Sequence, residues 1–121
     1  RQRKQFGKAI GSFQALQHRA VDLYVQTELA RSAIDRAARI LSSDADAREK
    51  ALAASACKAR VSDGALMIAR ESIQMHGAIG YTDEHNIGLY VRRALKNVAW
   101  LGNGAQHRKR YAALAPALEL V

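Results

Sequence analysis

The feature that most constrains the fold is a run of apolar or small residues at alternating spacings of three and four. It comprises Phe13, Leu16, Ala20, Leu23, Thr27, Ala30, Ile34, Ala37 and Leu41. This spacing places all of them on one face of a continuous helix. Ser12 is the predicted N-cap, and Ser42-Ser43-Asp44 is predicted to end the helix.

Further helices are predicted downstream. A second runs from about Asp44 to His76, a third from about Ile87 to Leu101, and a short fourth over residues 105–114, ending near Pro116. The inward stripe predicted for the second consists of Ala54, Cys57, Val61, Ala65, Ile68 and Met75. Thr82 or Asp83 is the predicted cap before the third helix.

These elements predict an all-α fold. No segment alternates with period two, so we expect no strands, and the product is an antiparallel helical bundle of two long helices and two shorter ones. Two helices of about thirty residues would each span about 45 Å, which is long for one small domain. We therefore expect their outer faces to pack on another subunit or domain.

The distribution of charge limits the partners. The formal net charge is +8, and ten of the eleven acids lie between Asp22 and Glu84, whereas His85 to Leu118 contains none. Basic ends of this kind favour an acidic protein surface or a polyanion, such as a phosphate-bearing cofactor or nucleic acid. No compact helix-turn-helix appears, so a DNA-binding module is the weaker alternative and we expect no nucleic acid. No apolar run is long enough to span a membrane, so we expect no membrane partner.

The sequence shows no residue pattern typical of a catalytic nucleophile or of a metal site. Cys57 is the only cysteine, so neither a disulfide framework nor a cysteine metal cluster is predicted. The four histidines (His18, His76, His85 and His107) do not pair at metal-ligand spacing, and no serine lies in a nucleophile-elbow context. The sequence therefore predicts no metal site and no catalytic triad.

Three segments nevertheless carry binding groups. RKQFGKAIGSFQALQ (residues 3–17) offers an arginine for phosphate and glutamines for an amide or heterocycle. ESIQMHGAIGY (residues 71–81) ends a helix in glycines that let backbone approach a ligand. NVAWLGNGAQHRKR (residues 97–110) contains a glycine-broken turn with no acid. Each also fits an ordinary role, as a surface arginine, a helix C-cap or a plain turn.

Taken in order, these segments resemble the acyl-CoA dehydrogenases. The pattern is R-x-Q-F-G-x-x-I-x-x-F-Q-x-x-Q, then Q-x-x-G-x-x-G-Y-x-x-E, then a helix with R-R-A and a turn containing G-N. It covers essentially all 121 residues and falls on the C-terminal all-α domain of that family. The resemblance implies an FAD-dependent oxidoreductase whose N-terminal helical and middle β domains lie outside this chain. It also implies dimers or tetramers in which bundles of neighbouring subunits meet.

The resemblance also assigns cofactor-binding residues. Arg3 is expected to meet the FAD pyrophosphate with Gln5 and Phe6 beside it, while Phe13 and Gln14 line the adenosine part. The end of the second helix is expected to form a backbone shelf against the FAD of a neighbouring subunit, with Gln74, Met75, Gly77 and Ala78. Asn103, in the later turn, is expected to offer a polar group to the flavin. Ala78 stands where the family usually has a second glycine.

The catalytic position departs from the family. Many members carry a glutamate base in the turn after the third helix, and this chain has Leu101 there, which cannot accept a proton. The base then lies upstream of Arg1, or the chain is the non-catalytic partner in a heteromeric dehydrogenase of the kind bacteria use on steroid side chains. The third account is a different flavin chemistry, such as the oxygen activation of a monooxygenase.

The resemblance further implies the surroundings of the protein. They are an acyl-CoA substrate (fatty acid or steroid side chain), an electron-transfer flavoprotein-like acceptor and a bacterial cytoplasmic location. A purely structural dimerisation bundle is the alternative from a different class of protein.

Overall fold

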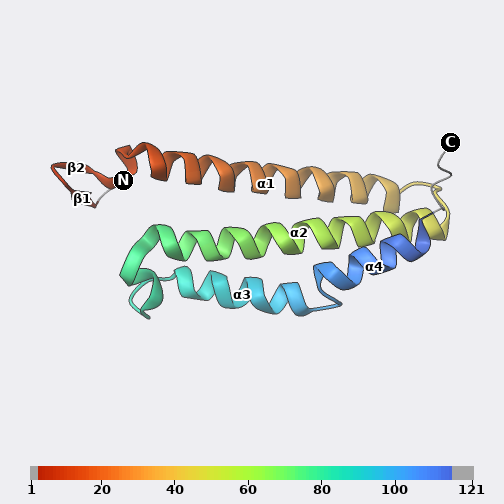
Figure 1. The fold of residues 1–121 in the computed structure, drawn as a ribbon. Coiled ribbons are helices and arrows are strands. Elements are labelled where there is room, and N and C mark those ends of the chain that lie inside the picture. Colours follow the sequence, from red (N-terminus) through yellow and green to blue (C-terminus); the bar gives the residue numbers. More distant parts are fainter. Residues whose placement is uncertain (1–2, 116–121) are drawn as a thin grey trace.

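The computed structural model describes residues 3–115. Over that range the chain forms four α-helices: α1 (Gln14–Leu41), α2 (Ala47–His76), α3 (Ile87–Ala99) and α4 (Gly104–Leu114) (Figure 1). The predicted all-α antiparallel bundle of two long and two shorter helices is confirmed. Arg1 and Pro116, the residues named above as the start of the chain and the stop of the last helix, lie outside the described range.

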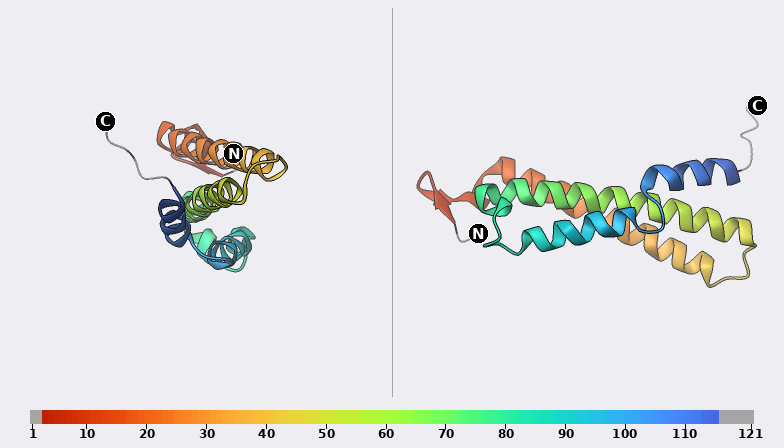
Figure 2. Two further views of the ribbon diagram at one scale, coloured as in Figure 1. Left: turned by 90° about the vertical axis from the view of Figure 1, so that its right-hand side faces the viewer. Right: turned by 90° about the horizontal axis from the view of Figure 1, so that it is seen from below.

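Helix α2 is the centre of the bundle. Helix α1 runs antiparallel along one side of it, and α3 and α4 follow one another along the other side (Figures 1 and 2). The packing contacts follow this arrangement, because α2 contacts each of the other three helices. None of the helices in residues 3–115 is both long and apolar enough to cross a bilayer.

The centre of the bundle is built from small residues. The buried positions on α2 are Ser55, Ala59, Ser62, Gly64 and Ala69. Small side chains let α2 lie close to helices on both of its sides. Larger apolar side chains lie at the surface instead, among them Tyr24 and Val25 on α1, which are 64% and 45% exposed.

Four of the nine positions in the stripe predicted for α1 face solvent. Leu16, Leu23 and Ala30 are half-buried and Ala37 is buried, as predicted. The intervening inward positions are Gln26, Ala33 and Ile40, whereas the predicted Ala20, Thr27, Ile34 and Leu41 are exposed. The predicted stripe and the observed one both have spacings of three and four, so the pattern alone does not distinguish them. The difference arises because Gln26, although polar, hydrogen-bonds Arg60 of α2 and so takes an inward position.

The N-terminus of α1 also differs from the prediction. The helix begins after Phe13, and no side chain caps it. The Ser12 hydroxyl donates instead to the Ala9 carbonyl at 2.7 Å, within a short 3-10 helix, Ile10–Ser12 (η1). Ser12 is therefore not the N-cap. Helix α2 is capped by Asp46, which accepts from the Glu49 N–H at 2.7 Å, so it starts three residues after the predicted Asp44.

A small β-hairpin precedes α1, and the expectation of no strands was wrong. Strand β1 (Lys4–Gln5) pairs antiparallel with β2 (Lys8–Ala9) across the turn residues Phe6 and Gly7, whose φ angles are 54° and 75°. Two successive positive φ angles are typical of a tight two-residue hairpin turn. Strands this short leave no alternating pattern to detect.

The segment between α2 and α3 contains a second 3-10 helix, Gly77–Tyr81 (η2). Neither predicted cap acts at the start of α3, because the Thr82 hydroxyl bonds the Ile79 carbonyl and Asp83 pairs with Arg92 at 3.1 Å. The Ile87 N–H donates to Nδ1 of His85 instead, at 3.1 Å. A histidine performs the local role that the sequence assigned to an oxygen side chain.

Candidate functional site

The hairpin, the start of α1 and the end of α2 meet at one end of the bundle (Figure 1). Together they line an open groove of about 480 Å³. Its lining includes eight of the residues assigned to cofactor binding from the sequence: Arg3, Gln5, Phe6, Phe13, Gln74, Met75, Gly77 and Ala78. Residues about seventy positions apart in sequence are thus brought to one surface.

Arg3 is positioned by the hairpin and faces the end of α2. The Ile10 N–H donates to the Arg3 carbonyl at 3.0 Å, which closes the hairpin behind the side chain. A Cβ added to Gly77 would lie 4.0 Å from Arg3 Nη1. Gly77 also has a φ of 69°, where glycine is favoured. The guanidinium group therefore lies beside bare backbone at the helix end, in an arrangement that leaves a ligand access to both.

Two aromatic rings stand on the other wall of the groove. Phe6 and Phe13 meet edge to face, with ring centroids 6.2 Å apart, and Lys8 Nζ lies 4.5 Å from the centre of the Phe13 ring. Phe6 is 89% exposed, although large apolar side chains are usually buried. Cations beside aromatic rings suit a ligand with both phosphate and a heterocycle. The groove therefore offers a guanidinium, amide side chains and aromatic rings to a ligand.

Lys8 was not assigned to the site from the sequence. It does not itself line the groove, and the signal that places it nearby is its spacing. Lys8 follows the Phe6-Gly7 turn, so the hairpin brings its ammonium group over Phe13.

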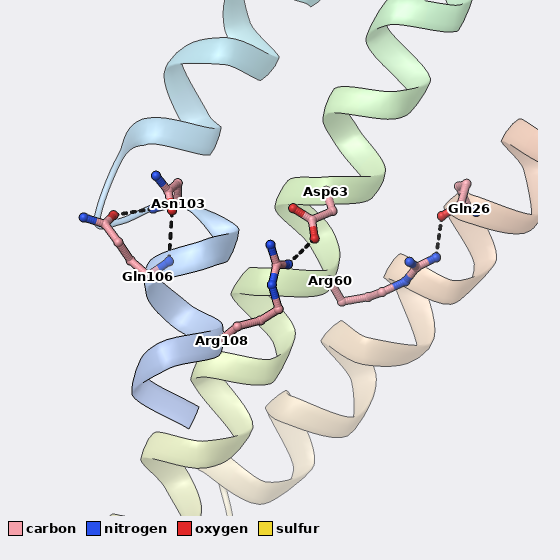
Figure 3. Close-up of polar contacts among 6 residues, drawn as sticks. All are labelled: Gln26, Arg60, Asp63, Asn103, Gln106 and Arg108. Carbon is pink, nitrogen blue, oxygen red and sulfur yellow. Dashed lines mark hydrogen bonds and ion pairs between the residues drawn. The ribbon is translucent and has the colours of Figure 1, made fainter. Parts of the chain in front are cut away.

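Two assigned residues do not line the groove. Gln14 is the exposed first residue of α1, next to the groove residue Phe13. Asn103 lies at the start of α4 and caps it: its Oδ1 accepts from the Gln106 N–H at 3.0 Å, and the Gln106 side chain accepts from the Asn103 N–H at 2.8 Å (Figure 3). The structure therefore gives Asn103 a helix-capping contact and does not bring it to the other site residues.

The turn that carries Leu101 is exposed and conformationally unusual. Leu101 is 76% exposed with a φ of 60°, and Gly102 follows with a φ of 98°. Nε2 of His107, on the first turns of α4, lies 2.9 Å from the Leu101 carbonyl oxygen. The turn offers a leucine side chain to solvent and no carboxylate of its own.

An ion pair holds α4, and hence this turn, against α2, and a hydrogen bond joins α2 to α1. Arg108 of α4 pairs with Asp63 of α2, and Arg60 of α2 hydrogen-bonds Gln26 of α1 (Figure 3). A Cβ added to Gly104 would lie 2.5 Å from Asp63 Oδ1, so α4 approaches α2 through a residue without a side chain.

Two other features of the sequence remain outside the groove. Burial raises the pKa of the Cys57 thiol above its ordinary value of 9.0, which disfavours the reactive thiolate. Within residues 3–115, histidine, cysteine and carboxylate side chains form no group of three that could hold a metal ion.

Comparison with known proteins places the chain among relatives. The family model described as acyl-CoA dehydrogenase, C-terminal domain, matches residues 1–114. The acyl-CoA dehydrogenase IpdE2 of Mycolicibacterium smegmatis is 38% identical over 111 residues, which are 92% of this chain and 33% of IpdE2. The chain thus spans about a third of the length of that relative.

Solved structures agree with the sequence comparison. Butyryl-CoA dehydrogenase from Megasphaera elsdenii superposes with a TM-score of 0.85 at 26% identity, over 93% of this chain and 28% of that one. A Tcur3481-Tcur3483 steroid ACAD variant superposes with a TM-score of 0.84 at 27% identity, over 93% and 30%. With the fold, the sequence match over almost its whole length and these relatives in agreement, the chain belongs to the acyl-CoA dehydrogenase family, as a C-terminal domain of that family.

Proposed function

We propose that this chain is the C-terminal helical domain of an FAD-dependent acyl-CoA dehydrogenase and that the groove holds the nucleotide part of FAD. The observation that carries the proposal is the convergence of Arg3, Phe6 and Phe13 with the segment 74–78. The N-terminal helical and middle β domains would come from outside residues 1–121. The greater length of the relatives supports this domain organisation.

Each wall of the groove has a distinct task. Arg3 forms bidentate hydrogen bonds with the pyrophosphate, because a guanidinium matches two phosphate oxygens at once. Gly77 lets the pyrophosphate approach the backbone, and Gln5 and Gln74 supply amide groups for hydrogen bonding. Phe13 packs against the adenosine part, with Gln14 at its edge. Bound FAD would supply the redox chemistry, accepting a hydride from the β-carbon of an acyl-CoA.

The same turn that carries the base in many relatives would here contribute none. Leu101 has no proton acceptor, so the α-proton must be removed by a carboxylate upstream of Arg1 or in a partner subunit. We favour a non-catalytic role in a heteromeric dehydrogenase acting on fatty or steroid acyl-CoA. The likeness to a Tcur3481-Tcur3483 steroid ACAD supports this choice. Asn103 keeps a polar group beside the turn, and through its α4 cap it holds the turn in shape.

The outer faces of the bundle fit an oligomer. Val21, Tyr24, Val25 and Leu29 form an exposed apolar strip on α1, which a neighbouring subunit would cover. A homo- or hetero-oligomer in the bacterial cytoplasm, passing electrons to an electron-transfer flavoprotein-like acceptor, completes the proposal.

The test is anaerobic reduction of the flavin. The protein that carries this chain is loaded with FAD, and flavin absorbance is followed while a panel of fatty and steroid acyl-CoA thioesters is added. We expect the flavin to stay oxidised with this protein alone and to bleach when the partner subunit is added. Bleaching without the partner would contradict the non-catalytic role and indicate a base upstream of Arg1.

A variant sharpens this test. Leu101→Glu restores a carboxylate at the turn, and we expect it to permit bleaching without the partner. Leu89→Glu is the matched control, because it adds a carboxylate at another exposed leucine, on α3, away from the turn. Equal behaviour of the two variants would mean that the turn does not face the flavin.

A further inference from the structure

His76 lines the same groove, and the proposed function leaves it without a task. We propose that the His76 ring accepts a hydrogen bond from a neutral hydroxyl or amino group of the bound dinucleotide, and that His85 positions this ring. The proposal rests on the proposed FAD groove and adds a contact residue and a positioning residue to it.

The hydrogen bond of His76 fixes its tautomer. Nδ1 lies 2.6 Å from the Ser72 carbonyl oxygen, one helical turn earlier. A carbonyl oxygen only accepts, so Nδ1 must carry the hydrogen. In the neutral ring Nε2 is then unprotonated, and within the described residues the ring's hydrogen bond is the one from Nδ1. His76 lines the groove, so this acceptor could pair with a donor group bound there.

His85 holds the opposite tautomer and lies against His76. Its Nδ1 accepts from the Ile87 N–H at 3.1 Å, so that nitrogen carries no hydrogen. The two ring centroids are 4.4 Å apart with their planes at 49°. Because the backbone bond anchors His85 at the start of α3, its ring restrains the plane of His76 from the side.

Close backbone packing also restrains the His76 side chain. A Cβ added to Gly80 would lie 3.1 Å from the His76 Cβ and 2.9 Å from the Ile73 carbonyl oxygen. The η2 turn therefore packs directly on the base of the His76 side chain. With Ser72, His85 and Gly80 around it, the ring is placed in advance of binding, which lowers the entropic cost of the contact.

The chemistry of the groove indicates which group His76 meets. Arg3 in the groove, and Lys8 beside the groove residue Phe13, already offer cations for phosphate oxygens. An unprotonated imidazole nitrogen cannot donate to phosphate and instead pairs with a donor. The groove is proposed to hold the nucleotide part of FAD, whose neutral donors are hydroxyl groups and the amino group of adenine, so His76 recognises one of these.

The experiment compares FAD affinity among variants of the complete protein with its subunits. His76→Phe keeps an aromatic ring but removes the acceptor, and we expect FAD binding to weaken about three- to tenfold. His76→Gln places an amide oxygen near the position of Nε2 and should recover most of the affinity. His18→Phe, at an exposed position on α1, is the control and should bind as the unsubstituted protein does.

An analogue separates the two donors. With hypoxanthine in place of adenine, the amino group is absent. If the His76→Phe effect disappears with this analogue, the partner is the adenine amine; if it persists, the partner is a hydroxyl group.

The positioning role needs a readout other than affinity. ¹⁵N chemical shifts of the histidine rings report which nitrogen is protonated, and we expect His76 to be protonated at Nδ1 and His85 at Nε2. His85→Asn keeps an acceptor for the Ile87 N–H but removes the ring. It should leave His76 exchanging between tautomers and weaken FAD binding, whereas His85→Phe keeps the ring and should retain the affinity better.

The outcomes are distinguishable. Failure of the unsubstituted protein to bind FAD would remove the proposed function and this inference with it. Tight FAD binding that is equal in the unsubstituted protein and His76→Phe would remove only the inference. So would ¹⁵N shifts that show His76 protonated at Nε2.

Discussion

Nε2 of His107 lies 2.9 Å from the carbonyl oxygen of Leu101, six residues earlier in the chain. Because the carbonyl only accepts, Nε2 must donate, which leaves Nδ1 without a hydrogen in the neutral ring. Nδ1 is buried and has no partner within the described residues. Leu101 has a φ of 60°, which a leucine rarely adopts. His107 on α4 thus stabilises a strained turn through one ring nitrogen, while its other ring nitrogen is buried without a hydrogen-bond partner among the described residues.

Removal of this contact should loosen the turn. Trp100 and Leu101 are exposed residues of the kind chymotrypsin cleaves after. A neutral hydrogen bond contributes about 1 kcal/mol, so we expect His107→Ala to raise the rate of cleavage at these residues about fivefold. His18→Ala is the control on α1. An unchanged cleavage rate in His107→Ala would show that the turn keeps its shape without the histidine.

The approach of α4 to α2 depends on Gly104. A methyl group there would lie 2.5 Å from Asp63 Oδ1, so Gly104→Ala must displace Asp63 and its ion pair with Arg108. We expect a loss of about 1–3 kcal/mol of unfolding free energy in urea titration. Gly88→Ala is the matched control: nothing lies within 4 Å of its added Cβ. Because Gly88 is in α3, this control should gain up to about 1 kcal/mol. Equal effects would argue against the close approach.

Substitutions of Asn103 can distinguish a helix-capping role from a contact with the cofactor. Asn103→Ala loses the capping box of α4 and should cost about 1 kcal/mol, as seen in the thermal midpoint. Asn103→Asp keeps a capping oxygen and should retain the midpoint. If Asn103 also contacts the flavin, the new charge in Asn103→Asp should shift the flavin absorbance spectrum. A midpoint as low in Asn103→Asp as in Asn103→Ala would show that the side-chain oxygen is not what stabilises the helix.

The thiol of Cys57 should be slow to react. Burial raises its pKa above 9.0, so the folded protein disfavours the thiolate. Stability from this group is present below the unfolded-state pKa and is lost as pH rises through the folded-state pKa. Cys57 is the only cysteine in residues 1–121, so iodoacetamide alkylation against pH is followed on the peptide that carries it. We expect a midpoint above 9.0 in the folded protein; a midpoint at or below 9.0 would contradict this environment.

Much of the fold was predictable because long helices leave a long periodic signal. The repeated spacing in residues 13–41 identified α1, and small residues in residues 47–76 identified a closely packed α2. The prediction of which face of α1 packs inward was wrong at four positions, and polar Gln26 turns inward to meet Arg60. Alternation could not reveal the hairpin, whose strands are two residues long.

The local contacts were harder to predict because they depend on partners far along the chain. The pattern Asn103-x-x-Gln106 is a capping signal, but it was interpreted as part of a cofactor turn. The role of His85 at the start of α3 depends on the conformation of residues 77–86, which no periodicity describes. The assignment of the groove from the sequence depended on the resemblance, and the structure adds the contacts among Arg3, Gly77 and Phe13 that residue types alone cannot give.

The most direct test of the account is the affinity of the complete protein for FAD with and without Arg3, measured by quenching of flavin fluorescence. Charge-assisted hydrogen bonds to phosphate contribute about 1.5–3 kcal/mol, so Arg3→Ala should weaken binding by about 10- to 150-fold. Arg3→Lys should fall between, because an ammonium keeps the charge but not the bidentate geometry. Arg110→Ala, which removes an exposed cation from α4, should have no effect. Equal weakening by Arg3→Ala and Arg110→Ala, or by neither, would contradict the assignment of the groove to FAD.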